Sequence, residues 1–273
     1  MTRLFTSSFS HIILFIGISI MVVPVWMIFA SSTHTSSFIY SHGLQFFIGD
    51  SFHENYLRVL LYQGGFFKEI TALKMFFNSF IMATGVALLS VFTSLMAAYA
   101  LVYYRTKYAT FLFWLIFVTI LVPLELRIFP TYSVMAKLNL VNSYFGLIVP
   151  ISASAIATLF FRQFYKTVPD ELLESAKLDG ANTWRFFVDF LIPLSKTMIA
   201  AVFIFMFVFG YNQYLWPLIM TTTEQYWTVV MGLKTMYGSI SDRFAFVIMS
   251  MLPPVIIIIF LQRWFIQGIF QNK

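Results

Sequence analysis

Six long stretches that contain no Asp, Glu, Lys or Arg constrain this chain more than any other feature of its sequence. Each stretch holds about 17–30 residues, and a helix needs roughly 20 apolar residues to cross the hydrocarbon core of a bilayer. The stretches are Ile12–Ala30, Met75–Tyr104, Tyr108–Leu124, Leu138–Phe161, Thr197–Thr223 and Phe244–Gln262. We therefore predict an all-α membrane protein that forms a single transmembrane domain over residues 1–273. Its six transmembrane helices are expected at about residues 11–30, 76–104, 108–124, 142–162, 197–220 and 244–265.

The composition excludes an ordinary soluble domain. Hydrophobic residues make up 60% of the chain and charged residues 10%, whereas soluble domains average about 45–50% apolar and about 25% charged residues. Residues 111–118 are apolar at every position, which excludes the alternating strands of an outer-membrane barrel. The net charge of +6 does not indicate a nucleic-acid partner, because the basic residues lie between the apolar stretches and not on one clustered surface. Without cysteine the chain has no disulfide and no cysteine nucleophile.

The basic residues orient the predicted helices. Cytoplasmic segments of membrane proteins carry an excess of Lys and Arg. If both termini share one side with residues 105–107 and 162–196, that side holds ten of the 17 basic residues and the other side holds seven. We therefore expect both termini in the cytoplasm and the apolar helices in contact with membrane lipid.

The first external segment, residues 31–74, contains three of the four histidines, namely His34, His42 and His53. Their spacings of 8 and 11 residues match no compact metal-binding pattern such as H-x3-H. The Ser, Gly and Asn residues around them are typical of loops. The sequence therefore predicts no metal site.

The segment between the fourth and fifth predicted helices, residues 166–196, is far longer than two neighbouring helices require, which is typical of a functional loop. A first short helix is expected there. Thr167 is a possible N-cap, and the carboxylates of Asp170 and Glu171 suit the positive end of the helix. Gly180 is expected to end this helix in a left-handed cap.

A second short helix is expected in the same loop, with Thr183 as its N-cap. The apolar residues expected on its buried side are Trp184, Phe187, Phe190 and Leu191. The first helix carries acidic residues on several sides, so anionic lipid would repel it. A basic groove on a partner protein would attract it.

Three stretches of this loop resemble the EAA loop of the membrane subunits of bacterial ATP-binding-cassette importers. They are Glu174-Ser175-Ala176, Asp179-Gly180-Ala181 and Phe190-Leu-Ile-Pro193. The family pattern has Glu-Ala-Ala, a glycine, and a hydrophobic-x-hydrophobic-Pro ending, and this chain departs from it at Ser175, a small residue in place of an alanine. The stretches 78–79, 161–164, 211–217 and 262–265 are also similar to those of the carbohydrate-importer permease group.

The resemblance implies a coupling helix that sits in a groove of a separate ATPase subunit and transmits the closure of two such ATPases to the membrane helices. It implies a transporter subunit and not an enzyme, with no cofactor of its own, because ATP and Mg bind to an ATPase homodimer. A second homologous permease and an extracytoplasmic substrate-binding protein complete the implied assembly in the bacterial inner (plasma) membrane. The implied ATPase-coupling residues are Glu171, Glu174, Ser175, Ala176, Asp179, Gly180, Ala181 and Pro193.

Residues 122–131 and 211–214 look most like those of permeases that import sn-glycerol 3-phosphate. A phosphomonoester carries close to two negative charges near neutral pH, so its pathway needs a fixed positive partner. Arg127, beyond the third predicted helix at its outer end, is the best candidate, because a guanidinium holds phosphate through paired hydrogen bonds. The alternative is an interfacial arginine that extends to water or pairs with Glu125.

The remaining substrate-pathway candidates are polar residues in or beside the predicted helices. With Arg127, they are Glu125, Asn78, Asn212, Gln213 and Tyr214. For the last three, hydrogen bonding between helices is the alternative. Glycerophosphodiesters satisfy the same charge argument, and a neutral sugar or oligosaccharide remains an alternative cargo. An ion-coupled secondary transporter is a distant alternative, because it needs ionisable residues within the helices.

Overall fold

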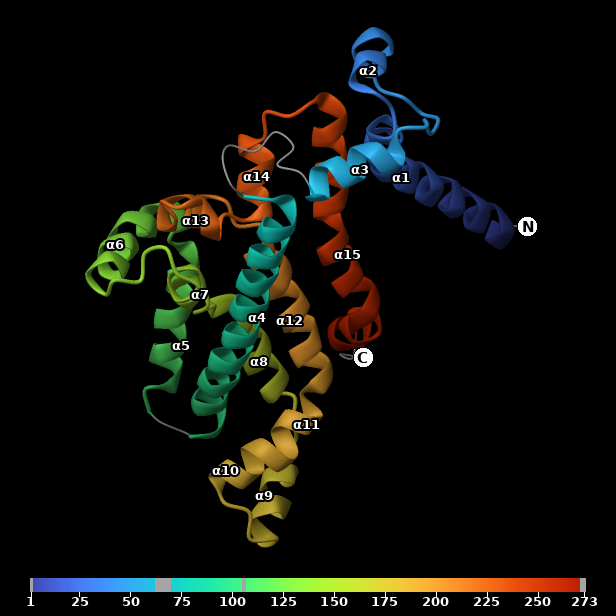
Figure 1. Ribbon diagram of the computed structural model, residues 1–273. Coiled ribbons are helices and arrows are strands. Elements are labelled where there is room, and N and C mark those ends of the chain that lie inside the picture. The colour runs from blue at the N-terminus through green and yellow to red at the C-terminus, as the bar shows by residue number, and fades with distance from the viewer. Residues whose placement is uncertain (1, 62–69, 105–106, 271–273) are drawn as a thin grey trace. The chain divides into compact units, whose positions relative to one another are not determined.

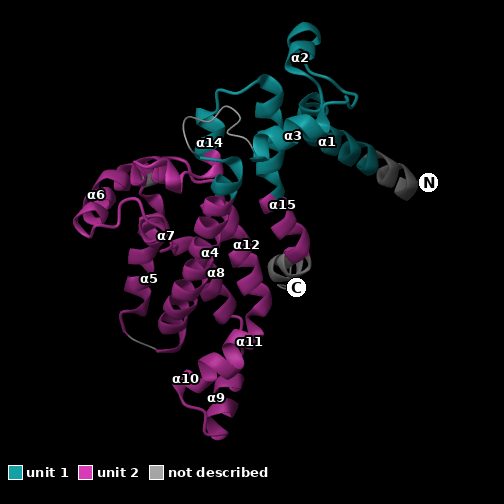
Figure 2. Cartoon of the chain, viewed as in Figure 1, with its two compact units in different colours: residues 1–76, 231–252 teal, residues 77–230, 253–273 magenta. Residues whose placement is uncertain are grey.

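The structure is a computed structural model, and it describes residues 2–61, 70–104 and 107–270. Every secondary-structure element that these residues form is a helix (Figure 1). The chain divides into two compact units (Figure 2). Unit 1 comprises residues 1–76 and 231–252, and unit 2 comprises residues 77–230 and 253–273. The all-helical fold that the apolar stretches predict is confirmed.

Three helices are each long and apolar enough to cross a membrane without a break. They are α1 (Thr2–Ser32), α4 (Ala72–Tyr103) and α15 (Ile240–Phe270). They cover the first, second and sixth predicted transmembrane helices. Helices α1 and α15 continue through Pro24 and through Pro253 and Pro254, so these prolines do not end them.

Three further apolar segments are bent pairs of helices, and they bring the number of possible crossings to six if each pair is one span. The first pair joins α5 (Ala109–Val118) and η1 (Thr119–Leu121) to α6 (Leu124–Lys137), with a bend of 104°. The second joins α7 (Tyr144–Ile148) and η2 (Val149–Ile151) to α8 (Ala155–Tyr165), with a bend of 50°. The third joins the segment Thr183–Leu194 to α12 (Lys196–Tyr211), with a bend of 74°.

Residues 125–137, between the third and fourth predicted transmembrane helices, belong to helix α6. Pro123 has an extended backbone, with φ of −54° and ψ of 143°, so it ends η1 and serves as the N-cap of a new helix. Glu125 in the first turn and Lys137 in the last turn of α6 complement the helix dipole. The chain therefore turns sharply at Pro123 and remains helical.

Two predicted helices are interrupted. The fifth, expected over residues 197–220, consists of α12 and α13 (Leu215–Met220), which Asn212–Tyr214 separate. The fourth, expected over residues 142–162, is interrupted at residues 152–154. Ser154 is the N-cap of α8, because its hydroxyl accepts a hydrogen bond from the Ala157 amide. A run of apolar residues does not reveal such breaks.

In unit 1, the predicted external loop contains two helices, α2 (Ser36–His42) and α3 (Phe52–Leu61). Three fully buried residues at the end of α1 hold the loop between these helices. The Gln45 amide donates to Ser31 Oγ over 2.8 Å, and the Gly49 amide donates to Thr33 Oγ1 over 2.7 Å. Asn55 Nδ2 donates to the Ser32 carbonyl over 2.8 Å. Local polar contacts, which hydropathy does not report, therefore order this segment.

Unit 1 also includes the greater part of α14 (Val229–Thr235) and the first part of α15. Arg58 of α3 lies 3.7 Å from the carboxylate of Asp242, whose side chain is 5% exposed. This ion pair joins α3 to the start of α15, so it links the two sequence segments that make up unit 1.

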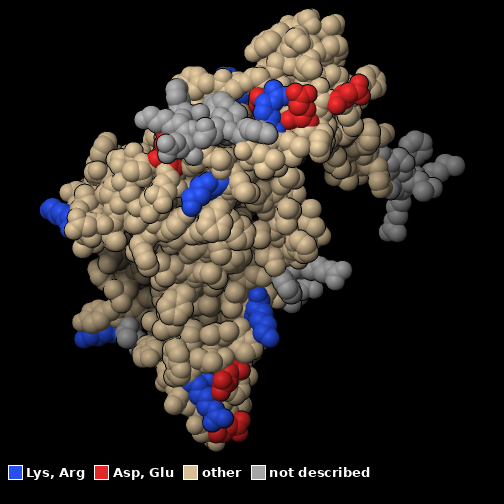
Figure 3. Space-filling view, in the orientation of Figure 1, with Lys and Arg blue, Asp and Glu red and all other residues tan. Residues whose placement is uncertain are grey.

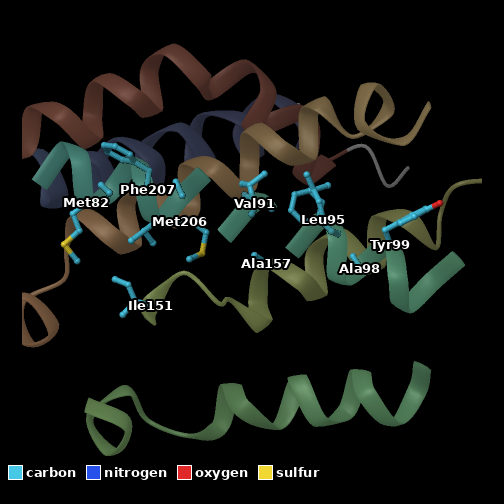
Figure 4. Close-up of a cluster of buried hydrophobic side chains, with 14 of the residues drawn as sticks. Met82, Val91, Leu95, Ala98, Tyr99, Ile151, Ala157, Met206 and Phe207 are labelled. Atoms are coloured by element: carbon cyan, nitrogen blue, oxygen red, sulfur yellow. The ribbon is translucent and has the colours of Figure 1, made fainter. Parts of the chain in front are cut away.

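The core of unit 2 lies between α4, α8 and α12. In Figure 4, side chains such as Met82 and Val91 of α4, Ala157 of α8 and Phe207 of α12 lie together. A Cβ atom placed on Gly210 would lie 3.1 Å from the Cα atom of Ala83, so α12 and α4 approach closely there. Small residues permit such close packing between membrane helices, whose association depends on van der Waals contact.

Candidate functional site: the coupling loop and a cavity beside Arg127

Helix α9 (Asp170–Leu178) is the first short helix that the loop sequence predicts. Charged side chains of both signs gather at the α9 end of unit 2 (Figure 3). Asp170 and Glu171 lie in the first turn and Lys177 lies in the last turn, which suits the helix dipole at both ends. The N-cap is Pro169 and not Thr167, whose hydroxyl instead donates to the Phe164 carbonyl over 2.7 Å.

Gly180 ends α9 as predicted. Its φ of +78° is in the left-handed region, which glycine adopts without strain. The Gly180 amide donates to the Lys177 carbonyl over 3.0 Å, and the Ala181 amide donates to the Ala176 carbonyl over 2.9 Å. These two bonds form a Schellman motif, with the expected apolar contact position at Ala176 and Ala181. Ala176 is buried and Ala181 is half-buried. Both alanines therefore pack toward the core of unit 2 and stabilise the turn.

The outer surface of α9 carries several exposed residues to which the resemblance assigns ATPase coupling. Glu171, Glu174 and Ser175 lie at helical spacings of three and four residues, so they share one face. Leu178 continues this face and is 89% exposed. Leu178 was not among the residues predicted for ATPase coupling. Its helical spacing from Glu171 and Glu174 could have indicated that it shares their face.

The second half of the loop comprises α10 (Thr183–Arg185), the π-helix η3 (Phe186–Leu191) and α11 (Ile192–Leu194). Its N-cap is Asn182 and not Thr183, because Asn182 Oδ1 accepts a hydrogen bond from the Arg185 amide over 2.8 Å. The exposed coupling residues beyond α9 are Asp179, Gly180 and Pro193.

The buried side of this second helix differs in part from the prediction. Phe187 and Leu191 are buried as expected, and Phe190 is half-buried. Trp184 is 60% exposed, and Phe186 is buried in its place. The π-helix adds a residue to the turn and rotates the side chains relative to a regular α-helix, so the predicted face was wrong at Trp184.

Arg127 lies in the first turns of α6 and lines a cavity of about 170 Å³. The opposite walls come from residues 150–156, around the break before α8, and from Phe205, Met206 and Phe209 of α12. Glu125 is exposed and does not line this cavity. Among the described residues, no carboxylate lies within ion-pair distance of Arg127. The guanidinium therefore retains its hydrogen-bonding capacity on the side of the cavity.

Asn78 is fully buried, and its side-chain amide is engaged within unit 2. Its Nδ2 donates to the carbonyls of Gln225 and Trp227, each over 2.8 Å, and its Oδ1 accepts from Tyr144 Oη over 2.7 Å. These bonds hold the segment before α14 against α4. The geometry therefore favours a structural role for Asn78 over contact with a substrate.

Residues 212–214 lie in the break between α12 and α13 and not in the middle of a continuous helix. Asn212 is exposed, and Gln213 Nε2 donates to the Phe209 carbonyl over 3.2 Å. Neither Gln213 nor Tyr214 lines the Arg127 cavity, although Phe209 does. The predicted pathway residues therefore do not form one site. Instead, Arg127 lines a cavity together with residues around the helix break at 152–154. Pro150 and the sequence Ser152-Ala-Ser-Ala155 were the available signals for that break.

Metal ligation finds no support in the described ranges. No group of three or more His, Asp or Glu side chains within them is arranged to hold a metal ion. His34 and His42 take part in local contacts, since each ring stacks on Phe38.

Comparison with known proteins connects this geometry to a transport family. Residues 90–271 match the family described as the binding-protein-dependent transport system inner membrane component. The sn-glycerol-3-phosphate transport system permease protein UgpE of Yersinia pestis bv. Antiqua (strain Antiqua) is 38% identical over 272 residues, which cover 97% of this chain and 96% of that protein. The protein of the same name from Brucella melitensis biotype 1 is 38% identical over 271 residues, which cover 96% of this chain and 95% of that protein.

The fold also has a counterpart of known structure. A chain from the crystal structure of a bacterial ABC transporter involved in the import of the acidic polysaccharide alginate matches with a TM-score of 0.80. The match covers 96% of this chain and 97% of that chain at 20% sequence identity. At this identity the match establishes a shared fold.

Proposed function

This chain belongs to the family of binding-protein-dependent transport system inner membrane components, and from that premise we propose that it is the permease subunit of an ATP-binding-cassette importer that carries sn-glycerol 3-phosphate. The observation that carries this proposal is the 38% identity over 97% of the chain to a permease named for that substrate. Glycerophosphodiesters are a second cargo of the same chemistry. An ion-coupled transporter that works alone does not belong to this family.

The proposed assembly contains two copies of an ATPase, a second homologous permease and an extracytoplasmic substrate-binding protein. ATP and Mg bind to the ATPases, because this chain lacks a G-x-x-x-x-G-K-[ST] signature for phosphate binding. The exposed face of α9, with Glu171, Glu174, Ser175 and Leu178, is the proposed seat of one ATPase. The Schellman turn at Gly180 supports this role, since it fixes the end of α9 against the rest of the loop.

The proposed cycle is alternating access in the bacterial inner membrane, with both termini in the cytoplasm. ATP binding closes the ATPases, and the coupling loop transmits this closure to the membrane helices. The pathway then opens outward and receives the substrate from the binding protein. Hydrolysis resets the inward-facing state.

Arg127 is the proposed phosphate-guiding residue. It lines the cavity together with the start of α8, and it has no carboxylate partner among the residues that the structure describes. A guanidinium offers paired donors to a phosphate, and the N-terminal end of a helix also favours negative charge. Both features of the cavity therefore support an anionic cargo over a neutral sugar.

The test is the ATPase activity of the whole complex in lipid vesicles, with binding protein and one substrate at a time. The substrates are sn-glycerol 3-phosphate, glycerophosphocholine and maltose. We expect stimulation by the phosphate esters and no stimulation by maltose. Stimulation by maltose alone would overturn the proposed cargo and leave the family assignment intact.

A further inference from the structure

Helix α4 is bound at two places to segments that have different roles in the proposed cycle. Near its C-terminal end it contacts the second half of the coupling loop. About two and a half turns earlier, roughly 13 Å along the helix axis, it contacts the break before α8. Both contacts lie within unit 2.

The contact with the coupling loop centres on Tyr99. Its hydroxyl donates a hydrogen bond to the Thr183 carbonyl over 2.7 Å, and its ring lies on that of Phe187 with 4.8 Å between centroids. One turn further on, the ring of Tyr103 meets that of Phe186 at 5.4 Å. Both phenylalanines are buried. Helix α4 is therefore attached to the segment that directly follows the Gly180 turn.

The start of α9 is not attached to α4 in the same way. A cavity of about 390 Å³ lies there, lined by Tyr103 of α4, by Pro169 and by Leu173 of α9, among others. The Tyr103 hydroxyl also donates to the Tyr165 carbonyl over 3.4 Å. A displacement of α9 therefore reaches α4 through the segment before α9 as well as through the Gly180 turn and the Thr183 carbonyl.

The second contact holds the break in the fourth predicted helix. Ser90 Oγ donates to the Ser152 carbonyl over 2.7 Å, and Ser94 Oγ donates to the Ser154 carbonyl over 3.3 Å. Ser90, Ser94 and Ser152 are all buried. In a membrane, backbone groups freed by a helix break need such partners. Ser154 and its neighbour Ala153 line the Arg127 cavity, so α4 also fixes one wall of that cavity.

We propose that α4 relays movement of the coupling loop to the wall of the Arg127 cavity, and that Tyr99 is the positioning residue that joins the loop to this helix. The relay rests on the proposed function, because that function makes α9 the seat of the ATPase. A continuous helix in a close-packed interior moves as a rigid body. Its two hydroxyl contacts therefore shift together when the loop moves.

The test uses a reporter cysteine in this cysteine-free chain. Ala153→Cys places a thiol on the cavity wall, and its rate of labelling by a small thiol reagent is measured in the complete complex. The measurement is made without nucleotide and after trapping with ATP and vanadate. The ratio of the two rates reports how far ATP-driven closure reaches the cavity wall.

We expect Tyr99→Phe to reduce this ratio about three- to tenfold, because the substitution removes one buried hydrogen bond and keeps the ring. The control is Tyr104→Phe, the same chemical change directly after the same helix on a side chain that is 59% exposed. It keeps the ring that lies 5.8 Å from that of Tyr99. That variant is expected to keep the ratio of the parent. Co-purification of the ATPase shows whether each complex assembles.

Ser90→Ala is the second variant, because it removes the shorter of the two serine hydrogen bonds to the break and leaves the coupling loop untouched. It carries the test if Tyr99→Phe fails to assemble, and it is also expected to lower the ratio. The double variant then separates a relay from two local defects. Effects of distant, independent sites add, whereas two contacts in one relay give a double variant no worse than the more severe single variant.

The relay is overturned if the parent shows no ATP-dependent change in labelling, if Tyr99→Phe responds like the parent, or if the two variants are additive. These outcomes are independent of the cargo, since the labelling assay contains no substrate. Stimulation of ATPase activity by maltose alone would contradict the proposed cargo without affecting the relay.

Discussion

At the scale of single residues, the proposed phosphate cargo depends on Arg127 more than on any other side chain. It is a cation on the wall of a cavity that is otherwise lined by apolar and small polar residues. The Arg127 side chain is exposed, so its charge also reaches water. The absence of an ion pair with Glu125 or with any other described carboxylate leaves its donors available to an anionic ligand.

We predict that Arg127→Gln lowers transport of sn-glycerol 3-phosphate at least tenfold, because a charged hydrogen-bonding pair contributes about 1.5–3 kcal/mol. Basal ATPase activity should remain unchanged. Arg127→Lys should restore only part of the transport, since an ammonium lacks the paired donors of a guanidinium. Uptake of labelled substrate into vesicles measures the effect, and Lys137→Gln on the same helix is the control. Full uptake by Arg127→Gln would exclude the phosphate-guiding role.

Gly180 offers a second test at this scale, because its role in the turn is a matter of backbone conformation. Its φ is +78°, that of Gly43 in unit 1 is +74°, and a Cβ atom on either glycine would have open space around it. An alanine at either position therefore meets strain from a positive φ without a steric clash, about 1–2 kcal/mol in the left-handed region. The strain at Gly43 is expected to be at least as large, because its ψ of −161° lies in a region that essentially only glycine adopts.

We predict that Gly180→Ala and Gly43→Ala both lower thermal stability, Gly43→Ala at least as much as Gly180→Ala, but that only Gly180→Ala weakens stimulation of the ATPase by loaded binding protein. The reason is that the Gly180 turn sets the direction of α9 relative to the rest of the coupling loop. Melting of the detergent-solubilised complex and its stimulated ATPase activity provide the two measurements. Equal loss of stimulation in both variants would indicate a general effect of instability.

At the scale of elements, absence of charge predicted the long helices and failed to predict where others break. Helices α1, α4 and α15 follow directly from their uncharged stretches, because a continuous helix satisfies its own backbone in lipid. The break at Ser152–Ser154 depends on hydroxyls from α4, far away in sequence. A single apolar stretch contains no information about such partners.

In the coupling loop, too, the sequence predicted the features that depend on neighbouring residues and missed those that depend on distant ones. Capping chemistry is local, so Asp170 and Gly180 marked the two ends of α9 correctly. The π-helix η3 is not local, since its wide turn allows both Phe186 and Phe187 to reach the core of unit 2. The prediction that Trp184 lies on the buried side was therefore wrong, although the helix itself was expected.

Leu178 tests the role of α9 as an element. We predict that Leu178→Gln lowers the affinity for the ATPase about tenfold or more, because burial of a leucine side chain contributes roughly 1.5–3 kcal/mol. Its stability should not change, since the side chain is 89% exposed in this chain. The fraction of ATPase retained on the immobilised permease measures binding. Leu138→Gln, at a leucine that is 58% exposed, is the control, and equal retention by the two variants would contradict docking through this face.

At the scale of the whole molecule, the candidate site could be predicted only in its separate parts. The coupling loop is a continuous segment, so its motif, its helix and its turn were all present in one stretch of sequence. The cavity combines residues from α6, the residue 152–154 break and α12. Arg127 was recognised because it carries a charge, whereas Phe209 and Ala153 have no distinctive chemistry. Asn78 drew attention through its polarity and proved to be hydrogen-bonded inside unit 2.

The arrangement of the whole chain in the membrane gives the last prediction, because six crossings require that successive connections alternate between the two sides. The chain contains no cysteine, so single cysteines can report each connection without background from this subunit. Suitable exposed positions are Tyr40, Tyr108, Leu138, Leu178 and Tyr237. In intact cells whose outer barrier has been made permeable, a membrane-impermeant thiol reagent should label positions 40, 138 and 237. Position 108 should react only after the inner membrane is opened, and position 178 only when the ATPase has also been removed, because the proposed interface covers it. Labelling of position 138 from the cytoplasmic side would mean that the bent pair α5–α6 returns without crossing, and the chain would then have fewer than six spans.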